Sequence, residues 1–561
     1  MAPGLAGFIA SGDDTQAWDD AVSRVLESLG AEFTVIGENG RRSGSGTEST
    51  ARRLTWFDTF DWRLYRGDLT LEFAAARRGG ELRLTARDTA ADVIAAQQLT
   101  GFQPSRPHAL ADLPDGPVTA RIAGLVAPRT LLPVLTVTVE TTAYRLLNED
   151  DKTVARLVIE QPFIPGDEPS PLAPRLTVTE VRGYQAEARR ASRLAGGVRG
   201  MAPAGEPAMA AALRAGGRSP ADYSNKIDAD ITAGMPAPLA AAAILLRLLD
   251  TVDANVAGVL ADTDIEFLHD LRVSVRRTRS ALKLFGDALV GRHGLTAEEL
   301  AVFAAEFKWV GDLTTPVRDL DVHLLDFEQT VAAVAAAKPD DLEPFRVFLE
   351  QRRRREFRAL TRGLRSPRYT GLMQDWRVRL TAIQRGQVNG KTVSGVRSGS
   401  PGRAAAGTAG SLAAERTRVA FKKVSKRGAA ITPDSPAESL HDLRKRCKEL
   451  RYVLEFFAPL HDKAAAKQVV GELKRLQDCL GEFQDTAVQI GEIRAQAAAM
   501  LAAHEAPAET LLAMGEVTAG LAARQQAARA DFERRFSAFA DVEGQRRMAL
   551  LLSGLAGQGQ K

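Results

Sequence analysis

Two stretches of the chain carry histidine, arginine and lysine at matching positions. The segments LHDLRVSVRRTRSALKLF (268–285) and LHDLRKRCKELRYVLEFF (440–457) align without a gap at an offset of 172 residues. Arginine offers phosphate a planar, bidentate fork, and lysine adds a compact point charge. Matched cations on two segments are therefore the residue types that could hold a polyanion without performing any bond chemistry.

A helix would place these cations on one face. At 100° per residue the side chains fall within a sector of about 80° in the first segment, and the second segment repeats the pattern; these are His269, Arg272, Arg276, Arg279 and Lys283, then His441, Arg444, Lys448 and Arg451. Beside each sector runs an apolar stripe expected to enter a core; its members are Leu271, Val275, Thr278, Leu282 and Phe285, then Leu443, Cys447, Leu450, Leu454 and Phe457.

Stacked like charges destabilise an isolated helix by a few tenths of a kcal/mol per pair. A single basic face of this kind is usually solvated, but the same pattern kept in two copies favours an anion site. The two histidines allow two interpretations. Each is either a neutral, hydrogen-bonded residue near a helix start or a donor that gains a proton when an anion arrives.

The segments that follow also match. FKWVGDLTTPVRDLD (307–321) aligns with LKRLQDCLGEFQDTA (473–487), which puts Lys308 on Lys474 and Asp319 on Asp485. Because order and spacing both repeat, the sequence predicts an internal duplication of a helical unit.

The 561 residues are enough for two or three domains. Near-alternation of apolar and polar residues predicts strands at 69–76, 81–88, 134–141, 154–161 and 175–182, after one helix at about 15–29. We therefore expect an α+β multidomain protein: an antiparallel β-barrel over 1–190, a flexible linker over 191–232, a helical half over 233–385, a flexible loop over 386–411 and a second helical half over 412–555.

The duplicated segments resemble the CHAD family, over about 235–550. That resemblance implies a duplicated antiparallel helical bundle whose halves face each other across a basic channel that binds inorganic polyphosphate. Matched to this sequence, the walls comprise His269, Arg272, Arg276, Arg279, Lys283 and Lys308 on one side, and His441, Arg444, Lys445, Lys448, Arg451 and Lys474 on the other. Glu449 stands where the first half has Arg277, so these two positions are weak candidates as ligands.

The N-terminal region resembles the CYTH, or triphosphate tunnel, family through RRLTWFDTFDWRLYRGDLTLEF (52–73) and TEVRGY (179–184). Active members use carboxylates to hold a divalent metal and cations to hold triphosphate. Here the first strand region, LAGFIAS, lacks the Glu-x-Glu-x-Lys pattern, Glu72 and Ala74 replace the arginine pair, and Arg87 replaces the lysine. Glu180 and Arg145 remain as matches. We therefore expect a barrel that does not hydrolyse triphosphate and, unless it is active, needs no metal.

Other features exclude further classes. Two cysteines, Cys447 and Cys479, cannot build a disulfide framework, and no apolar run is long enough to span a membrane. The N-terminus lacks the features of a signal peptide, so a cytoplasmic protein is expected. The resemblance to CHAD domains further implies placement on polyphosphate granules. Arg318 to His323 offers Asp319, Asp321 and His323, but the second copy keeps only Asp485, so no metal site is expected.

Two alternatives stay open: a metal-dependent inorganic triphosphatase in the N-terminal domain, and a nucleic-acid binder that uses the same basic faces. The arginine-rich run at 352–368 either extends the binding surface or is solvated, and the basic run at 422–427 allows the same two interpretations.

Overall fold

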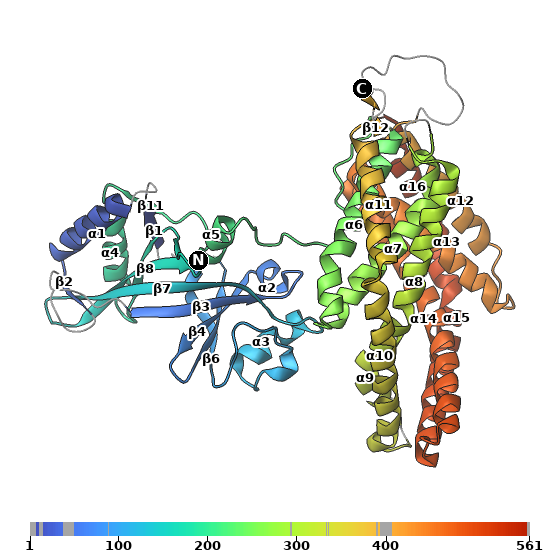
Figure 1. The fold of residues 1–561 in the computed structure, drawn as a ribbon, viewed down its shortest axis with the longest axis horizontal. Helices are drawn as coiled ribbons and strands as arrows, with labels where there is room; N and C mark the ends of the chain where they lie inside the picture. The colour runs from blue at the N-terminus through green and yellow to red at the C-terminus, as the bar shows by residue number, and fades with distance from the viewer. Residues whose placement is uncertain are drawn as a thin grey trace. The chain divides into compact units, whose positions relative to one another are not determined.

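The computed structural model describes residues 7–10, 15–37, 50–87, 89–291, 294–332, 334, 336–388, 391–392 and 407–557. The chain forms two compact units, Met1–Ser224 and Asn225–Lys561, which are described separately (Figure 1).

The first unit is built on an antiparallel sheet. Its strands run in the spatial order β11-β1-β10-β8-β7-β3-β4-β5-β6, with β2 also pairing with β7 and β9 with β8. Their bounds are β1 (Gly7–Ala10), β2 (Thr34–Gly37), β3 (Thr50–Asp58), β4 (Leu69–Ala76), β5 (Gly79–Ala86), β6 (Thr89–Leu99), β7 (Leu132–Leu147), β8 (Thr153–Ile164), β9 (Ser170–Pro171), β10 (Arg175–Glu180) and β11 (Met201–Pro203). Within the described residues β6 does not pair with β11, so the sheet is open. The structure thus corrects the predicted closed barrel to an open antiparallel sheet.

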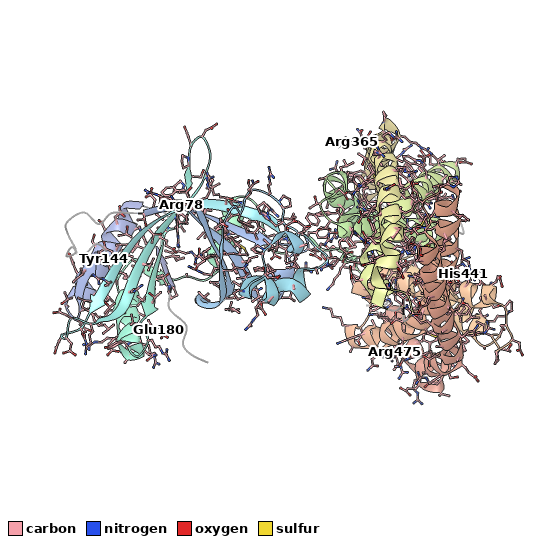
Figure 2. The ribbon with its side chains drawn as sticks, turned by 90° about the horizontal axis from the view of Figure 1, so that it is seen from below. Arg78, Tyr144, Glu180, Arg365, His441 and Arg475 are labelled. Carbon is pink, nitrogen blue, oxygen red and sulfur yellow. The ribbon has the colours of Figure 1, made fainter. Side chains whose placement is uncertain are left out.

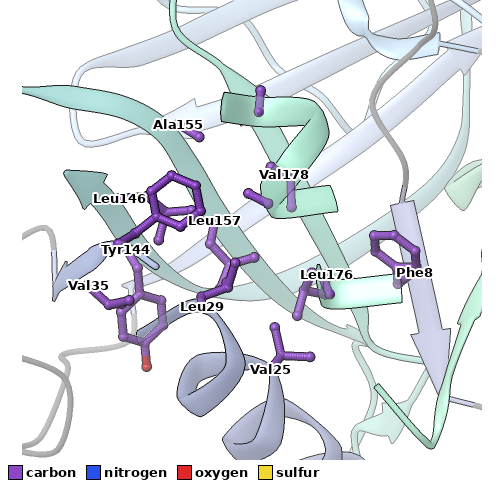
Figure 3. Packing of buried hydrophobic residues seen from close by; sticks show 14 of the residues in the cluster. Phe8, Val25, Leu29, Val35, Tyr144, Leu146, Ala155, Leu157, Leu176 and Val178 are labelled. Atoms are coloured by element: carbon purple, nitrogen blue, oxygen red, sulfur yellow. The ribbon is translucent and has the colours of Figure 1, made fainter. Parts of the chain in front are cut away.

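Two helices cover one face of this sheet. They are α1 (Thr15–Gly30) and α4 (Gln185–Gly196), which pack on each other and, through α4, on β8 and β10. Figure 3 shows the core between them, with Val25 and Leu29 of α1 against Leu157 and Leu176 of the strands. In β10 the buried residues Leu176 and Val178 alternate with more exposed ones, as the sequence predicted.

Shorter elements close the other end of the sheet: α2 (Arg63–Arg66), η1 (Leu110–Asp112) and α3 (Pro117–Val126). The buried carboxylate of Asp58 accepts the backbone N–H groups of Thr59, Leu64 and Tyr65 at 2.7–2.9 Å and so fixes the start of α2. Burial raises the pKa of Asp58 to about 6 despite these hydrogen bonds.

The predicted linker over 191–232 needs correction. Helix α4 extends into it, β11 pairs with β1, and α5 (Ala208–Ala215) buries Ala212 and Leu213 against Trp56. Small residues suggested a loop from sequence, but alanine also lets a helix approach a sheet closely.

The second unit is helical. Its first group of helices comprises α6 (Ala237–Leu260), α7 (Ile265–Phe285), α8 (Ala297–Leu325), α9 (Phe327–Ala332), α10 (Glu343–Leu364) and α11 (Pro367–Gln384), with 3-10 turns η2 (Gly286–Leu289) and η3 (Pro339–Leu342). Its second group comprises α12 (Ala409–Gly428), α13 (Ala437–Phe456), α14 (Lys463–Ala502), α15 (Ala508–Ala540) and α16 (Val542–Gly557), with η4 (Ala458–Leu460). Two short strands, β12 (Gln387–Val388) and β13 (Lys391–Thr392), lie between the groups; most of the predicted loop over 386–411 lies outside the described residues.

Local signals explain where the key helices begin. The carboxylate of Asp264 accepts the N–H groups of Glu266 and Phe267 at the start of α7. Thr296 and Glu299 form a capping box on α8, and Asp462 caps α14. Long helices with capped starts can hold charged side chains in fixed positions along their length.

The two groups repeat one arrangement. Helix α7 packs on α6 and α8, α13 packs on α12 and α14, and α7 and α13 pack on each other. The ring of Phe285 lies 5.4 Å from the rings of both Phe456 and Phe457, measured between centroids. Every residue of the two predicted apolar stripes is buried, which confirms the predicted orientation of both helices.

Candidate functional site

The contact between α7 and α13 carries two ion pairs that are related by the duplication. Arg277 Nη2 lies 3.1 Å from Glu455 Oε2, and Lys283 Nζ lies 2.6 Å from Glu449 Oε1. Arg277 aligns with Glu449 and Lys283 aligns with Glu455, so each pair is the counterpart of the other. The two helices therefore run antiparallel, with their register fixed by both pairs.

Four cations gather where the two basic faces meet. Lys448 of α13 lies close enough to Arg276 of α7, and to Arg444 and Arg451 on its own helix, for all three to lower its pKa. Burial is the largest cause, Asp485 opposes the shift, and the pKa of Lys448 falls to about 8. We call Arg276, Arg444, Lys448 and Arg451 the central cluster. Within the described part of the chain, the side chains of Arg276 and Lys448 have no hydrogen bond or ion pair.

Arg272 and Arg444 are each held by the next helix along the chain. Arg272 donates to Thr315 and lies 3.7 Å from the carboxylate of Asp319. Arg444 Nη2 lies 2.9 Å from Asp485 Oδ1. These two pairs occupy matching positions of the duplication. In each pair the aspartate holds one side of the guanidinium group. Burial lowers the pKa of Arg272.

Arg279 and Arg451 also occupy matching positions. A Cβ atom on Gly311 would lie 2.8 Å from Arg279 Nη1, so this glycine lets the guanidinium lie directly on α8. Arg451 Nη1 donates to Gln477 Oε1 at 2.9 Å, and its Nε lies 3.2 Å from Glu455 Oε1. Arg279 and Arg451, like Arg272 and Arg444, are thus held against α8 and α14, which limits the rotamer entropy that they lose on binding a ligand.

The outer cations differ in their partners. Lys308 pairs with Asp312 at 2.5 Å on the surface of α8. Lys474 and Lys445 are exposed and have no ion pair among the described residues. The ammonium of Lys283, expected in the channel wall, is engaged by Glu449, so its charge already serves the contact between α7 and α13.

The histidines lie beside the basic faces. His269 and His441 are both partly buried. His441, labelled in Figure 2, has a buried Nδ1 with no hydrogen-bond partner among the described residues. An imidazole with an unsatisfied nitrogen can still accept a donor or give a proton, so the two interpretations of His441 remain open.

Sequence reasoning missed two features of this site. It aligned Asp319 with Asp485 but did not pair them with Arg272 and Arg444. It also treated Glu449 only as a departure from the repeat, whereas Glu449 accepts from Arg446 and from Lys283. The signal was available, because an aspartate repeated beside a repeated arginine indicates an ion pair between neighbouring helices.

The N-terminal unit has a polar sheet face on which charges pair with each other. Arg52 lies 3.2 Å from Glu160, and Arg83 lies 3.6 Å from Glu72, whose pKa is raised by burial. Arg145 lies directly opposite Arg156 on the next strand.

The other expected remnants are dispersed. Arg87 lies in a turn after β5 and pairs with Asp68 at 2.6 Å. Glu180 ends β10 in the series of Leu176 and Val178, on the opposite side from Arg175. The residues aligned with a triphosphatase site therefore do not gather in one place. No group of three or more His, Cys, Asp or Glu side chains in the described ranges could hold a metal ion.

Comparisons with known proteins agree with the duplicated helices. Residues 243–494 match the family model of the CHAD domain, so the helical unit contains a CHAD domain. Among solved structures, the chain is similar to the CHAD domain from the plant Ricinus communis, with 26% identity over 56% of this chain and 96% of that one and a TM-score of 0.45.

Two further structures are more distant. PptA from Streptomyces chartreusis has 17% identity over 54% of this chain and 99% of that one, with a TM-score of 0.38. A protein of Bacillus halodurans described as a candidate adenylate cyclase has 15% identity over 34% of this chain and 90% of that one, with a TM-score of 0.23. No curated protein matched the chain. Among the described helices, none combines the length and the apolar character needed to cross a membrane.

Proposed function

We propose that the helical unit binds inorganic polyphosphate on the joined basic faces of α7 and α13. The central cluster carries this proposal, because the side chains of Arg276 and Lys448 stand among other cations and form no ion pair within the described residues. A phosphate chain would supply the missing negative charge. The resemblance to CHAD domains supports the same ligand class.

Binding should be tight only when several charges act together. Arg276 and Arg279 are exposed residues of α7, and Arg444 and Arg451 are held by contacts with α14. Each phosphate contact releases condensed counterions, so the affinity should fall steeply with salt. The proposed role is binding, because the central cluster is made of cations that can hold phosphate oxygens along a chain.

Proton linkage gives this proposal a second signature. Lys448 has a pKa of about 8 in the free protein. A phosphate oxygen beside its ammonium would raise that pKa, because an opposite charge favours the protonated form. Binding at about pH 8 should therefore take up protons. Calorimetry in buffers of different ionisation enthalpy would measure this uptake.

The direct test is binding of the full-length chain to labelled long-chain polyphosphate across a salt series. Arg276→Ala combined with Lys448→Ala should weaken binding at least tenfold and make the salt dependence shallower by about two charges. Arg77→Ala combined with Arg78→Ala is the matched control, since it removes two exposed cations from the β4–β5 turn of the other unit. Unchanged binding by the first variant would refute the site.

Competitors separate the alternatives. Single-stranded DNA that displaces polyphosphate as well as polyphosphate itself would indicate a generic basic surface. Release of phosphate from tripolyphosphate with magnesium or manganese would restore the triphosphatase alternative for the N-terminal unit. We further propose that the bound polymer places the protein on cytoplasmic polyphosphate granules, which a fluorescent fusion would test.

A further inference from the structure

Helix α10 divides its arginines into two sets. One set is engaged by neighbouring side chains. Its members are Arg346 with Glu343 and Glu350, Arg352 with Gln496, Arg353 with Asp262 and Asp321, and Arg354 with Glu350. The contacts of Arg352 and Arg353 hold α10 against α14 and α8. Those of Arg346 and Arg354 pair positive and negative charges within α10 itself.

The other set forms what we call the outer stripe: Arg355, Arg358, Arg362 and Arg365. All four are exposed, and none has a hydrogen bond, ion pair or ring contact of its side chain among the described residues. Their spacing of three, four and three residues keeps them within about 80° on one helix face. At 1.5 Å per residue the stripe is about 15 Å long. Figure 2 labels Arg365, at the junction of α10 and α11.

The arginines of the whole run point to several sides of α10, but these four share one side. The buried residues Leu349, Leu360 and Leu364 define the inner side, and the outer stripe lies on the opposite side. Four like charges at these spacings repel one another. The negative end of the helix dipole stabilises Arg362 in the last turn, but this effect does not reach Arg355.

The corresponding helix of the second group shows the contrast. Helix α15 packs along α14 as α10 packs along α8. Its arginines are engaged: Arg524 by Glu482, Arg529 by the carbonyl oxygens of Pro433 and Ser435, and Arg534 and Arg535 by Asp531. Unpaired arginines in a row are thus a property of α10 and not of this helix position in general.

The chemistry of the outer stripe selects its ligand. All four cations are arginines, whose forks match phosphate oxygens in pairs. Helix α11 begins at Pro367, just beyond Arg365, so its positive end offsets the negative end of α10 at this point. Apart from Val347, the large apolar side chains of α10 are buried or partly buried. Helix α10 therefore offers little apolar surface to a membrane and little to stacked bases.

We infer that the outer stripe is a second binding surface for a chain of phosphate groups, separate from the central cluster. A chain laid along α10 would meet a guanidinium at each turn and relieve the repulsion between them. This inference goes beyond the proposed function and does not require it, because the outer stripe lies on α10 and shares no residue with the central cluster on α7 and α13.

Two sets of substitutions in the full-length chain test it. The stripe variant carries Arg355→Gln, Arg358→Gln, Arg362→Gln and Arg365→Gln. The cluster variant carries Arg276→Ala and Lys448→Ala. A control of equal charge carries Arg77→Gln, Arg78→Gln, Arg182→Gln and Arg189→Gln, all exposed in the other unit. Labelled polyphosphate and single-stranded DNA of equal charge are titrated at several salt concentrations, and circular dichroism confirms folding.

We expect the cluster variant to keep a weaker, salt-sensitive binding of polyphosphate. A variant that carries both the cluster and the stripe substitutions should lose this binding. The stripe variant alone should lose about three- to tenfold in affinity for long chains, with a salt dependence shallower by up to about four charges. The inference is overturned if the stripe variant binds like the control, or if the residual binding accepts DNA and not polyphosphate. Full binding by the cluster variant would instead refute the proposed function and leave the stripe as the site.

Discussion

Lys448→Met should stabilise the helical unit while weakening its binding of polyphosphate. In the free protein the ammonium of Lys448 is partly buried beside Arg276, Arg444 and Arg451. Methionine has a similar length and fills the same space without a charge. The substitution therefore removes the cost of burying the ammonium and, with it, the repulsion from the three arginines.

The magnitude follows from the pKa of Lys448, which falls from 10.5 to about 8. At 1.36 kcal/mol per pKa unit this is roughly 3 kcal/mol, which screening of a partly exposed group reduces to roughly 1–2 kcal/mol. The folded chain holds this proton less tightly than the unfolded chain. The charged lysine therefore destabilises the fold below about pH 8, and the cost disappears as the pH rises toward 10.5.

Urea unfolding of the full-length chain, followed by helical circular dichroism, measures the effect. Lys448→Met should gain stability at about pH 7 and lose most of that gain at about pH 10. Lys445→Met is the control, because Lys445 is exposed on the same helix, and its effect should stay within about 0.5 kcal/mol. Equal stabilities of the two variants at both pH values would refute the crowding of positive charge around Lys448.

Three further predictions concern a carboxylate, an ion pair and two thiols. Asp58 has a pKa of about 6 in the folded N-terminal unit, so the folded unit binds this proton more tightly than the unfolded chain does. The thermal stability of the unit should therefore fall as the pH rises through 6. Asp58→Asn should flatten this dependence of stability on pH. Lys283→Glu should cost the helical unit about 0.5–1 kcal/mol in urea unfolding, and Glu449→Lys in the same chain should restore most of it. Cys447 and Cys479, with pKa values raised by burial to about 12 and about 11, should resist a thiol reagent at about pH 8 until the chain unfolds; rapid labelling of the native protein would contradict their burial.

Patterns within one element were readable from the sequence. The burial of Leu271 and Val275 in α7, and of Leu443 and Cys447 in α13, follows from helical spacing alone. The strand at Leu69–Ala76 likewise follows from alternation. Both patterns depend on neighbours a few residues apart, which any sequence displays directly.

Features that join distant elements were not readable in the same way. Whether β6 meets β11 depends on the twist and curvature of the whole sheet, so the barrel was a wrong prediction. Arg444 reaches Asp485 on another helix, 41 residues along the chain. A dense run of arginines does not show which side of the helix faces the core, so the common side of Arg355, Arg358, Arg362 and Arg365 is defined only once Leu360 and Leu364 are located.

The ion pairs between α7 and α13 have a consequence for which halves of the duplication pair with each other. If the first half met a second copy of itself, Arg277 would face Lys283; if the second half did so, Glu449 would face Glu455. Either encounter sets like charges against each other, which disfavours it. These two ion pairs therefore favour the contact between one half and the other over a contact between two copies of the same half. Because both halves belong to one chain, each half has its complementary partner at a high effective concentration.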